Sequence, residues 1–206
     1  RNQQMQIINA VKEKFTHFSV GLEFLNYTDQ SNINLYKLGL LSEPDFLKAV
    51  NWGGFDFGLY RDQLLSPNIN NFSLGINLPR EITKIIAQKG TQGLSPEQML
   101  LMPPQFTVGR NTYRERFFQA MGHPVPVESL ENYFVAQCAW DDTMAWQTVE
   151  FLKKNPNAIF IIIVGEFHIQ YGGGLPDRLL NRMKLSGLDN KIVTVSQVYS
   201  DVSLSD

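Results

Sequence analysis

The chain has 206 residues, a length that fits one ordinary to large domain. Hydrophobic residues make up 43% and charged residues 18%, so the chain can bury a packed core. The formal net charge is −2 and no basic stripe or polybasic run occurs, which argues against nucleic acid and an anionic membrane surface as partners. The single cysteine, Cys138, excludes an intrachain disulfide, and the longest apolar run, 158–164, is too short to span a bilayer.

Helices and strands are predicted to alternate through the first half of the chain. Met5, Ile8 and Val11 have helical spacing, and a short β-like run that ends in a carboxylate follows them. Ser42 is a good N-cap because acidic residues and a proline follow it. In chain order the pattern predicts a helix over 5–11, a strand over 17–24, a helix from 28 or 29 to 39, a helix after 42, a helix over 57–65, a strand over 69–78 and a helix over 79–89.

Residues 91–127 are rich in proline and hold only short helical pieces, so we expect a small helical cap inserted in the domain. The signals beyond the cap are a long helix over 129–154, a strand over 158–164, a helix over 176–184 and a last strand over 191–198. The alternation predicts the α/β class, with a parallel β-sheet flanked by helices and a smaller helical cap subdomain, all within a single domain over 1–206.

Polar side chains follow three of the predicted strands. Glu23 ends the first strand, Asn77 and Arg80 follow the second, and Glu166 and His168 follow the apolar strand. Because ligands of open parallel sheets bind outside the carboxyl ends of the strands, we expect these side chains to converge on one edge of the sheet. A carboxylate, a guanidinium and an imidazole together suit either a divalent metal or an anionic group of a ligand.

The long helix adds further polar residues. Tyr133, Gln137, Asp141 and Met144 follow one another at steps of four, four and three, so they share one face of the helix. This face either completes a ligand pocket at the strand ends or is simply the solvated face of the helix. Trp140 either lines an apolar pocket or fills the core.

His168 allows three interpretations, namely a metal or haem ligand, a general base, or a buried histidine satisfied by hydrogen bonds. Its position just beyond the apolar strand favours a functional role. The loop Tyr171-Gly172-Gly173-Gly174 adds to this, because glycines let the backbone approach a ligand closely. The loop lacks the spacing of a dinucleotide fingerprint, and the sequence contains no P-loop, Ser-His-Asp elbow or cysteine-rich metal motif. No catalytic residue is therefore assigned.

Several of these segments together resemble the ChaN-like haem-binding proteins, which are related to the wider Tiki and erythromycin-esterase-like superfamily. The resemblance runs in order over most of the chain, and the segments that carry it are Gly21–Phe24, Trp52, Gly75–Arg80, Ala136–Ala145, Gly165–His168 and Gly174–Pro176. Its most specific parts are the Ala-Gln…Trp-Asp…Met-Ala pattern and the Gly-x-x-His motif. The predicted cap carries little of it.

The resemblance implies a haem-binding protein of bacterial iron acquisition, in which two protomers enclose a pair of stacked haems with tyrosine and histidine near the iron. It also implies a protein of the bacterial cell envelope, either periplasm-facing or an outer-membrane lipoprotein, that meets a membrane only through a lipid anchor not contained in this chain. Haem and a second copy of the chain are the partners expected on this basis. A phenolate ligand needs a neighbouring donor or cation, and the candidates for haem contact are Tyr171, His123, Tyr113 and Tyr133.

The chain departs from the family pattern in one respect. That pattern begins with a strand that carries a first Gly-Glu-x-His motif, whereas this sequence holds only the second motif, Gly165–His168. Superfamily relatives use two such motifs, with a nearby glutamate, for metal-dependent hydrolysis. A peptidase-like or esterase-like hydrolase with a divalent metal on His168 and Glu23 is the alternative function, and a non-catalytic interaction protein is a third.

Overall fold

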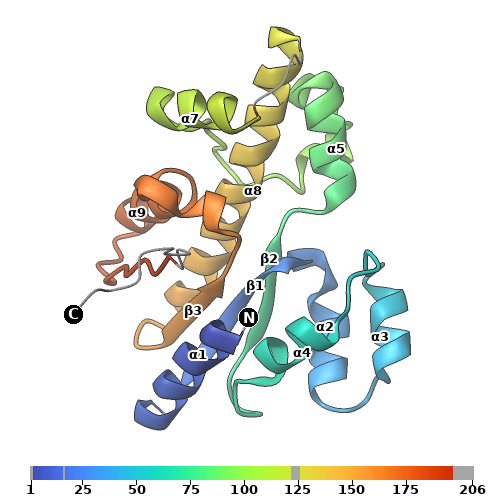
Figure 1. Ribbon diagram of the computed structural model, residues 1–206, viewed down its shortest axis with the longest axis vertical. Helices are drawn as coiled ribbons and strands as arrows, with labels where there is room; N and C mark the ends of the chain where they lie inside the picture. Colours follow the sequence, from blue (N-terminus) through green and yellow to red (C-terminus); the bar gives the residue numbers. More distant parts are fainter. Residues whose placement is uncertain (1, 16, 122–125, 197–206) are drawn as a thin grey trace, which may run out of the picture.

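The computed structural model describes residues 2–15, 17–121 and 126–196. Within this part of the chain the sheet has three strands, β1 (Phe18–Asn26), β2 (Ser73–Asn77) and β3 (Ile159–Ile163), in the spatial order β2-β1-β3 (Figure 1). Both strand pairs are parallel, and Val20 of β1 lies opposite Ser73 on one side and Ile161 on the other. The carboxyl ends of all three strands therefore face the same way, as the α/β prediction requires.

The helices are longer in total than the strands and account for most of the described chain. Short 3-10 turns, which connect several of the elements, are η1 (Tyr27–Asp29), η2 (Thr91–Gly93), η3 (Glu166–His168) and η4 (Gln170–Gly172). The α-helices are α1 (Asn2–Lys14), α2 (Gln30–Lys37), α3 (Glu43–Ala49), α4 (Gly58–Leu65), α5 (Arg80–Lys89), α6 (Pro96–Met99), α7 (Asn111–Met121), α8 (Val127–Lys154) and α9 (Leu175–Leu185).

Helices cover both faces of the sheet, and alternate side chains of β3 contact different layers. Ile161 and Ile163 pack with α1, α2, α3 and α4, whereas Phe160 and Ile162 pack with α8 and α9. This period of two is the expected pattern for a strand with apolar side chains on both faces, although β3 is an edge strand of the described sheet and only Ile163 is fully buried. Figure 1 shows α8 rising from the sheet to the upper end of the molecule, where α5 and α7 lie beside it.

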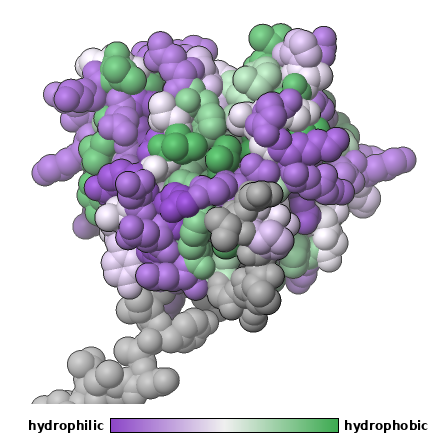
Figure 2. Space-filling view, turned by 90° about the horizontal axis from the view of Figure 1, so that it is seen from above, coloured by the Kyte–Doolittle hydropathy of each residue, from purple (hydrophilic) through white to green (hydrophobic). Residues whose placement is uncertain are grey.

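The upper helices have their own apolar contacts. Ile82 and Ile86 of α5 pack against Ala136 and Ala139 of α8, and Tyr113 and Phe117 of α7 belong to a neighbouring cluster that includes Phe134 and Cys138. Figure 2, seen from this end, shows hydrophobic atoms in the middle of the face with hydrophilic residues around them. That residues 91–127 form a distinct cap subdomain stays a prediction.

Most predicted helices are found within a few residues of their expected bounds. Ser42 is the N-cap of α3, where its side-chain oxygen accepts a hydrogen bond of 3.3 Å from the Asp45 amide. Helix α2 ends at Lys37 rather than at 39, and β2 is shorter than the predicted strand over 69–78. These differences are the usual uncertainty of element ends, where hydrogen bonds rather than side-chain pattern decide the limit.

The last predicted strand, 191–198, is wrong over the residues that the structure describes. Residues 191–196 form no strand, and 197–198 lie outside the described residues. Ile192 and Val195 instead line an apolar groove of about 370 Å³ together with β3, α1 and α9. A high β-propensity yields a strand only where a neighbouring strand supplies backbone hydrogen bonds, and here none is paired with this segment in the described sheet. Within the described residues, every helix is too short or too polar to cross a bilayer.

Candidate functional site

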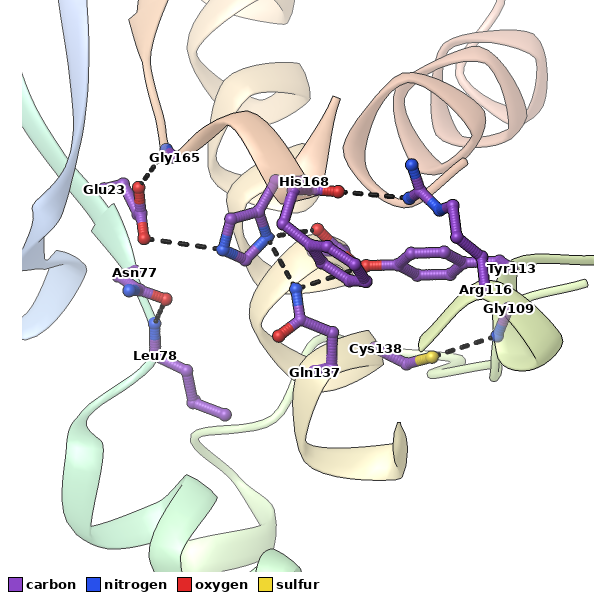
Figure 3. A network of polar contacts seen from close by, with 12 residues as sticks. Glu23, Asn77, Leu78, Gly109, Tyr113, Arg116, Gln137, Cys138, Gly165 and His168 are labelled. Atoms are coloured by element: carbon purple, nitrogen blue, oxygen red, sulfur yellow. Dashed lines mark hydrogen bonds and ion pairs between the residues drawn. The ribbon is translucent and has the colours of Figure 1, made fainter. Parts of the chain in front are cut away.

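The structure brings Glu23 and His168 together at the carboxyl edge of the sheet. Glu23 lies near the end of β1, and its Oε1 is 3.4 Å from Nε2 of His168, which follows β3 (Figure 3). Its second oxygen, Oε2, accepts a hydrogen bond of 2.5 Å from the Gly165 amide. The two strand ends are therefore tied to each other through one carboxylate.

Helix α8 contacts the other side of the same imidazole. Asp141 Oδ1 lies 2.6 Å from Nδ1 of His168, and Gln137 Nε2 lies 3.1 Å from the same atom. Gln137 and Asp141 are one helical turn apart, so both side chains reach the same point. The helix face predicted from the spacing is therefore buried from Gln137 onward, since the exposed fractions of Gln137 and Asp141 are 8% and 1%, whereas Tyr133 at its upper end is 41% exposed.

Tyr113 of α7 completes the network from the upper helices. Its hydroxyl donates to Asp141 Oδ2 over 2.7 Å and accepts from Gln137 Nε2 over 3.2 Å (Figure 3). Sequence reasoning named Tyr113 only as a haem contact and did not connect it to Asp141. The missing information is tertiary, because nothing in the local sequence indicates where α7 crosses α8.

The electrostatics of the network favour a positively charged histidine. Burial lowers the pKa of His168, but the neighbouring Asp141 and Glu23 carboxylates raise it more, to about 10. Burial, together with the Asp141 carboxylate, raises the pKa of Tyr113 far above its usual value, so its phenol stays protonated. Burial likewise raises the pKa of Cys138 to about 12, which fits the inert thiol expected from the sequence.

The glycine-rich loop closes over this network. Gly174 has φ +68°, and a Cβ atom there would lie 2.6 Å from the His168 carbonyl oxygen and 3.0 Å from Asp141 Oδ2. A Cβ at Gly173 would lie 3.1 Å from the Tyr113 ring. The loop contains glycine at these positions because the backbone passes against buried polar groups with no room for a side chain.

Tyr171 lies in the same loop but points outward. Its side chain is 89% exposed, and its backbone has φ +55°, a left-handed conformation that is uncommon outside glycine. The guanidinium carbon of Arg116 lies 5.4 Å from the centre of its ring. Sequence reasoning did not identify Arg116, although its place one turn after Tyr113 on the same helix face is a signal that could have found it.

The remaining predicted pocket residues have different surroundings. Trp140 packs edge-on to the His168 ring, with 6.4 Å between the ring centres. Met144 is fully buried in the core where α8 and α9 pack on the sheet. Asn77 ends β2, and its Oδ1 accepts a hydrogen bond from the Leu78 amide (Figure 3). Arg80 is exposed at the first turn of α5.

Three more predicted residues lie away from the buried network or beyond what is described. Glu166 is exposed and accepts a hydrogen bond of 2.8 Å from Ser196, and bonds from Gln170 and Ser196 lower its pKa. Tyr133 is 41% exposed on α8. His123 lies outside the described residues.

The donor set suits a protonated, hydrogen-bonded histidine better than a metal ligand. Both ring nitrogens of His168 face carboxylate oxygens at 2.6 Å and 3.4 Å. A metal-ligating histidine must be neutral and must leave one nitrogen for the ion. Among the residues described, no cluster of three or more histidine, cysteine, aspartate or glutamate side chains is arranged to hold a metal. The metal-dependent hydrolase is therefore not the favoured function.

Comparison with known proteins gives two findings. Residues 1–179 match the family model described as haem-binding uptake, Tiki superfamily, ChaN. The fold is similar to that of ChaN of Campylobacter jejuni, solved in a study of cofacial haem binding, with a TM-score of 0.67 and 21% sequence identity. The alignment covers 99% of this chain and 78% of the Campylobacter chain. A search of curated proteins finds no significant match.

Proposed function

Because the chain belongs to the ChaN family of haem-binding uptake proteins in the Tiki superfamily, we propose that it binds haem for uptake and that Tyr171 is the residue that ligates the iron. The observation that carries this assignment is the exposed phenol of Tyr171 beside the Arg116 cation, on a loop that covers a buried polar network. Tyrosine is an established axial ligand of haem iron, and a cation beside an aromatic ring is attracted to its face and helps to hold the ring in place.

The other candidate ligands suit this role less well. Tyr113 is only 3% exposed, and its hydroxyl is committed to Asp141. Its raised pKa also opposes the phenolate form that ferric iron prefers. Tyr133 is half as exposed as Tyr171, with 41% against 89%, and lies on the regular helix α8 rather than on a loop. Of these three tyrosines, Tyr171 is therefore the one that a flat ligand reaches most easily.

The buried network gives this loop a rigid base. The contact between His168 and Asp141 holds the segment after β3 against α8, and the carboxylate of Glu23 holds Gly165. We assign to this network the role of fixing the backbone from which Tyr171 projects. Haem itself would supply the iron centre, and the chain would supply the axial oxygen and a preorganised loop.

The finer features of the proposal concern assembly and location. ChaN of Campylobacter jejuni is described with cofacial haem, and a pair of stacked haems is most simply held between two copies of a chain. We accordingly propose a haem-linked homodimer, in which exposed Arg80 is one candidate to pair with a haem propionate. We further propose a place in the bacterial cell envelope, reached through a lipid anchor.

The proposal is tested by titrating the protein with hemin and following its absorbance. We expect a saturable Soret change with the charge-transfer bands of tyrosinate-ligated ferric haem. Tyr171→Phe should lose those bands and bind hemin at least tenfold more weakly, because the axial oxygen is gone. Tyr133→Phe is the matched control and should behave as the unmodified protein.

Two results would contradict the proposal in different ways. If the unmodified protein gives no saturable spectral change, then haem binding by this chain is wrong. If it does bind but Tyr171→Phe keeps the tyrosinate bands, another residue is the ligand.

A further inference from the structure

Arg116 of α7 is the only described cation with three aromatic rings around its guanidinium. The guanidinium carbon lies 5.1 Å from the ring centre of Tyr113, 4.7 Å from that of Phe167 and 5.4 Å from that of Tyr171. These rings belong to α7, η3 and η4 respectively. A single side chain from the upper helices therefore reaches the loop that follows β3.

The same guanidinium binds the backbone of that loop at two points. One terminal nitrogen donates to the carbonyl oxygen of Gln170 over 2.7 Å, and the other donates to that of Phe167 over 3.1 Å. Arginine presents its donors in a rigid planar fork, so two carbonyls held by it are fixed relative to each other. Lysine carries a single ammonium and cannot reproduce this geometry.

The positions of the two carbonyls in the chain show which segment the Arg116 guanidinium restrains. They come from residues 167 and 170, on either side of the turn that leads into Tyr171. Tyr171 itself has a left-handed backbone, which is strained for a residue with a side chain and persists only where its surroundings hold it. The bonds from Arg116 are direct restraints on this strained turn.

We infer that Arg116 is a positioning residue, which fixes the turn over 167–171 through its two carbonyl bonds and so holds the Tyr171 phenol outward for its ligand. The inference rests on the proposed function for the identity of that ligand, but not for the ordering of the loop. The positive charge of Arg116 also attracts the surrounding rings, as that of a lysine would. Only the planar fork of an arginine, however, can hold both carbonyls in this geometry.

The first arm of the test uses the protein without hemin. Hydrogen exchange of the backbone amides over 166–174 is compared for the unmodified protein, Arg116→Ala and Arg116→Lys. We expect both variants to exchange at least tenfold faster in this loop, while the rest of α7 stays protected, because only the loop loses its restraint.

Arg114→Ala is the matched control, because it removes the same charge from the same helix. Arg114 pairs with Glu131 of α8 and stacks on Phe118, with its guanidinium carbon 4.3 Å from that ring centre. Its contacts are therefore with the helices of the upper end. We expect the Arg114 variant to leave exchange over 166–174 unchanged.

The second arm adds hemin. Arg116→Ala and Arg116→Lys should both bind hemin about tenfold more weakly, and their tyrosinate bands should be broadened or lost, because the phenol is no longer held in one position. The inference is overturned if Arg116→Lys keeps the unmodified loop protection and affinity, since charge alone would then suffice.

The two arms separate this inference from the proposed function. Faster loop exchange in both Arg116 variants of a protein that does not bind hemin would support the positioning role and contradict haem binding. Hemin binding with Tyr171 as ligand, but with no change of loop exchange in the Arg116 variants, would overturn the positioning role alone.

Discussion

Asp141 serves two partners at once, one with each of its carboxylate oxygens. Oδ1 meets the His168 imidazole at 2.6 Å, and Oδ2 accepts the Tyr113 hydroxyl at 2.7 Å. The carboxylate is 1% exposed, so water cannot replace either partner. One buried acid on α8 therefore connects the segment after β3 with α7.

Replacing this acid by its amide tests how much the network depends on charge. Asp141→Asn leaves a buried imidazolium without its nearest counter-charge, and removing one partner of a buried ion pair typically costs about 3–5 kcal/mol. We expect a loss of that order in the free energy of unfolding, measured by urea denaturation at pH 7.

Glu150→Gln, on the same helix, is the comparison for that experiment. Glu150 pairs with Lys153 at the surface, where an ion pair contributes less than about 1 kcal/mol. An Asp141→Asn protein as stable as the Glu150→Gln protein would show that His168 is not charged in the folded state.

The raised pKa of His168 also makes stability depend on pH. The folded protein holds this proton up to about pH 10, whereas the unfolded chain releases it near pH 6.5. Between these values the folded state binds more protons, so stability must fall as pH rises, by up to about 1.4 kcal/mol per pH unit for one proton. The stabilisation is fully present below pH 6.5 and is lost as pH approaches 10.

The measurement is the difference in unfolding free energy between the unmodified protein and His168→Gln from pH 6.5 to 9.5. The difference is needed because burial lowers the pKa of Lys37 to about 8, and this shift makes stability rise with pH over part of the same range. We expect the difference to shrink steadily as pH rises. A difference that is constant over this interval would mean that His168 has an ordinary pKa.

At the scale of elements, the loop between β3 and α9 offers a test with an internal control. Gly172 and Gly174 both have positive φ, +71° and +68°. A Cβ atom at Gly172 would meet nothing within 4 Å, whereas one at Gly174 would lie 2.6 Å from the His168 carbonyl oxygen. Gly172→Ala should cost about 1 kcal/mol from backbone strain alone. Gly174→Ala should cost clearly more, because its Cβ meets the His168 carbonyl, and equal melting temperatures for the two variants would contradict this reading of the loop.

The sequence predicts the elements of this fold better than their mutual contacts. Glu23 and His168 can be expected to approach each other, because parallel strands end at the same edge and each residue follows a recognisable strand. The contact between Tyr113 and Asp141 cannot be predicted in this way, because it depends on how α7 crosses α8. The local sequence pattern indicates the periodicity of a helix or strand and the residues that cap it. The packing of one helix on another, in contrast, depends on the side chains of the whole core.

The same limit of local sequence pattern explains where the structure differs from the predictions. Residues 191–196 have the composition of a strand, but strand formation depends on a partner whose presence the local sequence does not report. Met144 shares a helical spacing with Gln137 and Asp141, yet it lies lower on α8, where the sheet rather than the site is its neighbour. Periodicity identifies a face of a long helix but not what each part of that face meets.

At the scale of the whole molecule, the arrangement places a buried, charged network under the exposed Tyr171. The sheet fixes β1 and β3, and α8 spans from the sheet to the upper helices. Tyr113 joins α7 to α8, and Arg116 joins α7 to the loop that carries Tyr171. An axial phenol that projects from the surface covers only one face of a haem. The opposite face of the ring must then meet either water or a second molecule.

This incomplete burial predicts that hemin changes the mass of the protein in solution. A haem held by one exposed tyrosine leaves a large apolar surface, and pairing two such surfaces removes both from water. We expect sedimentation to give one chain of 23.5 kDa without hemin and twice that mass at one hemin per chain. Tyr171→Phe should stay at the mass of one chain, because the haem is no longer anchored. Saturable binding at one hemin per chain with no increase in mass would mean that a single chain encloses its haem, and that the cofacial arrangement is not shared.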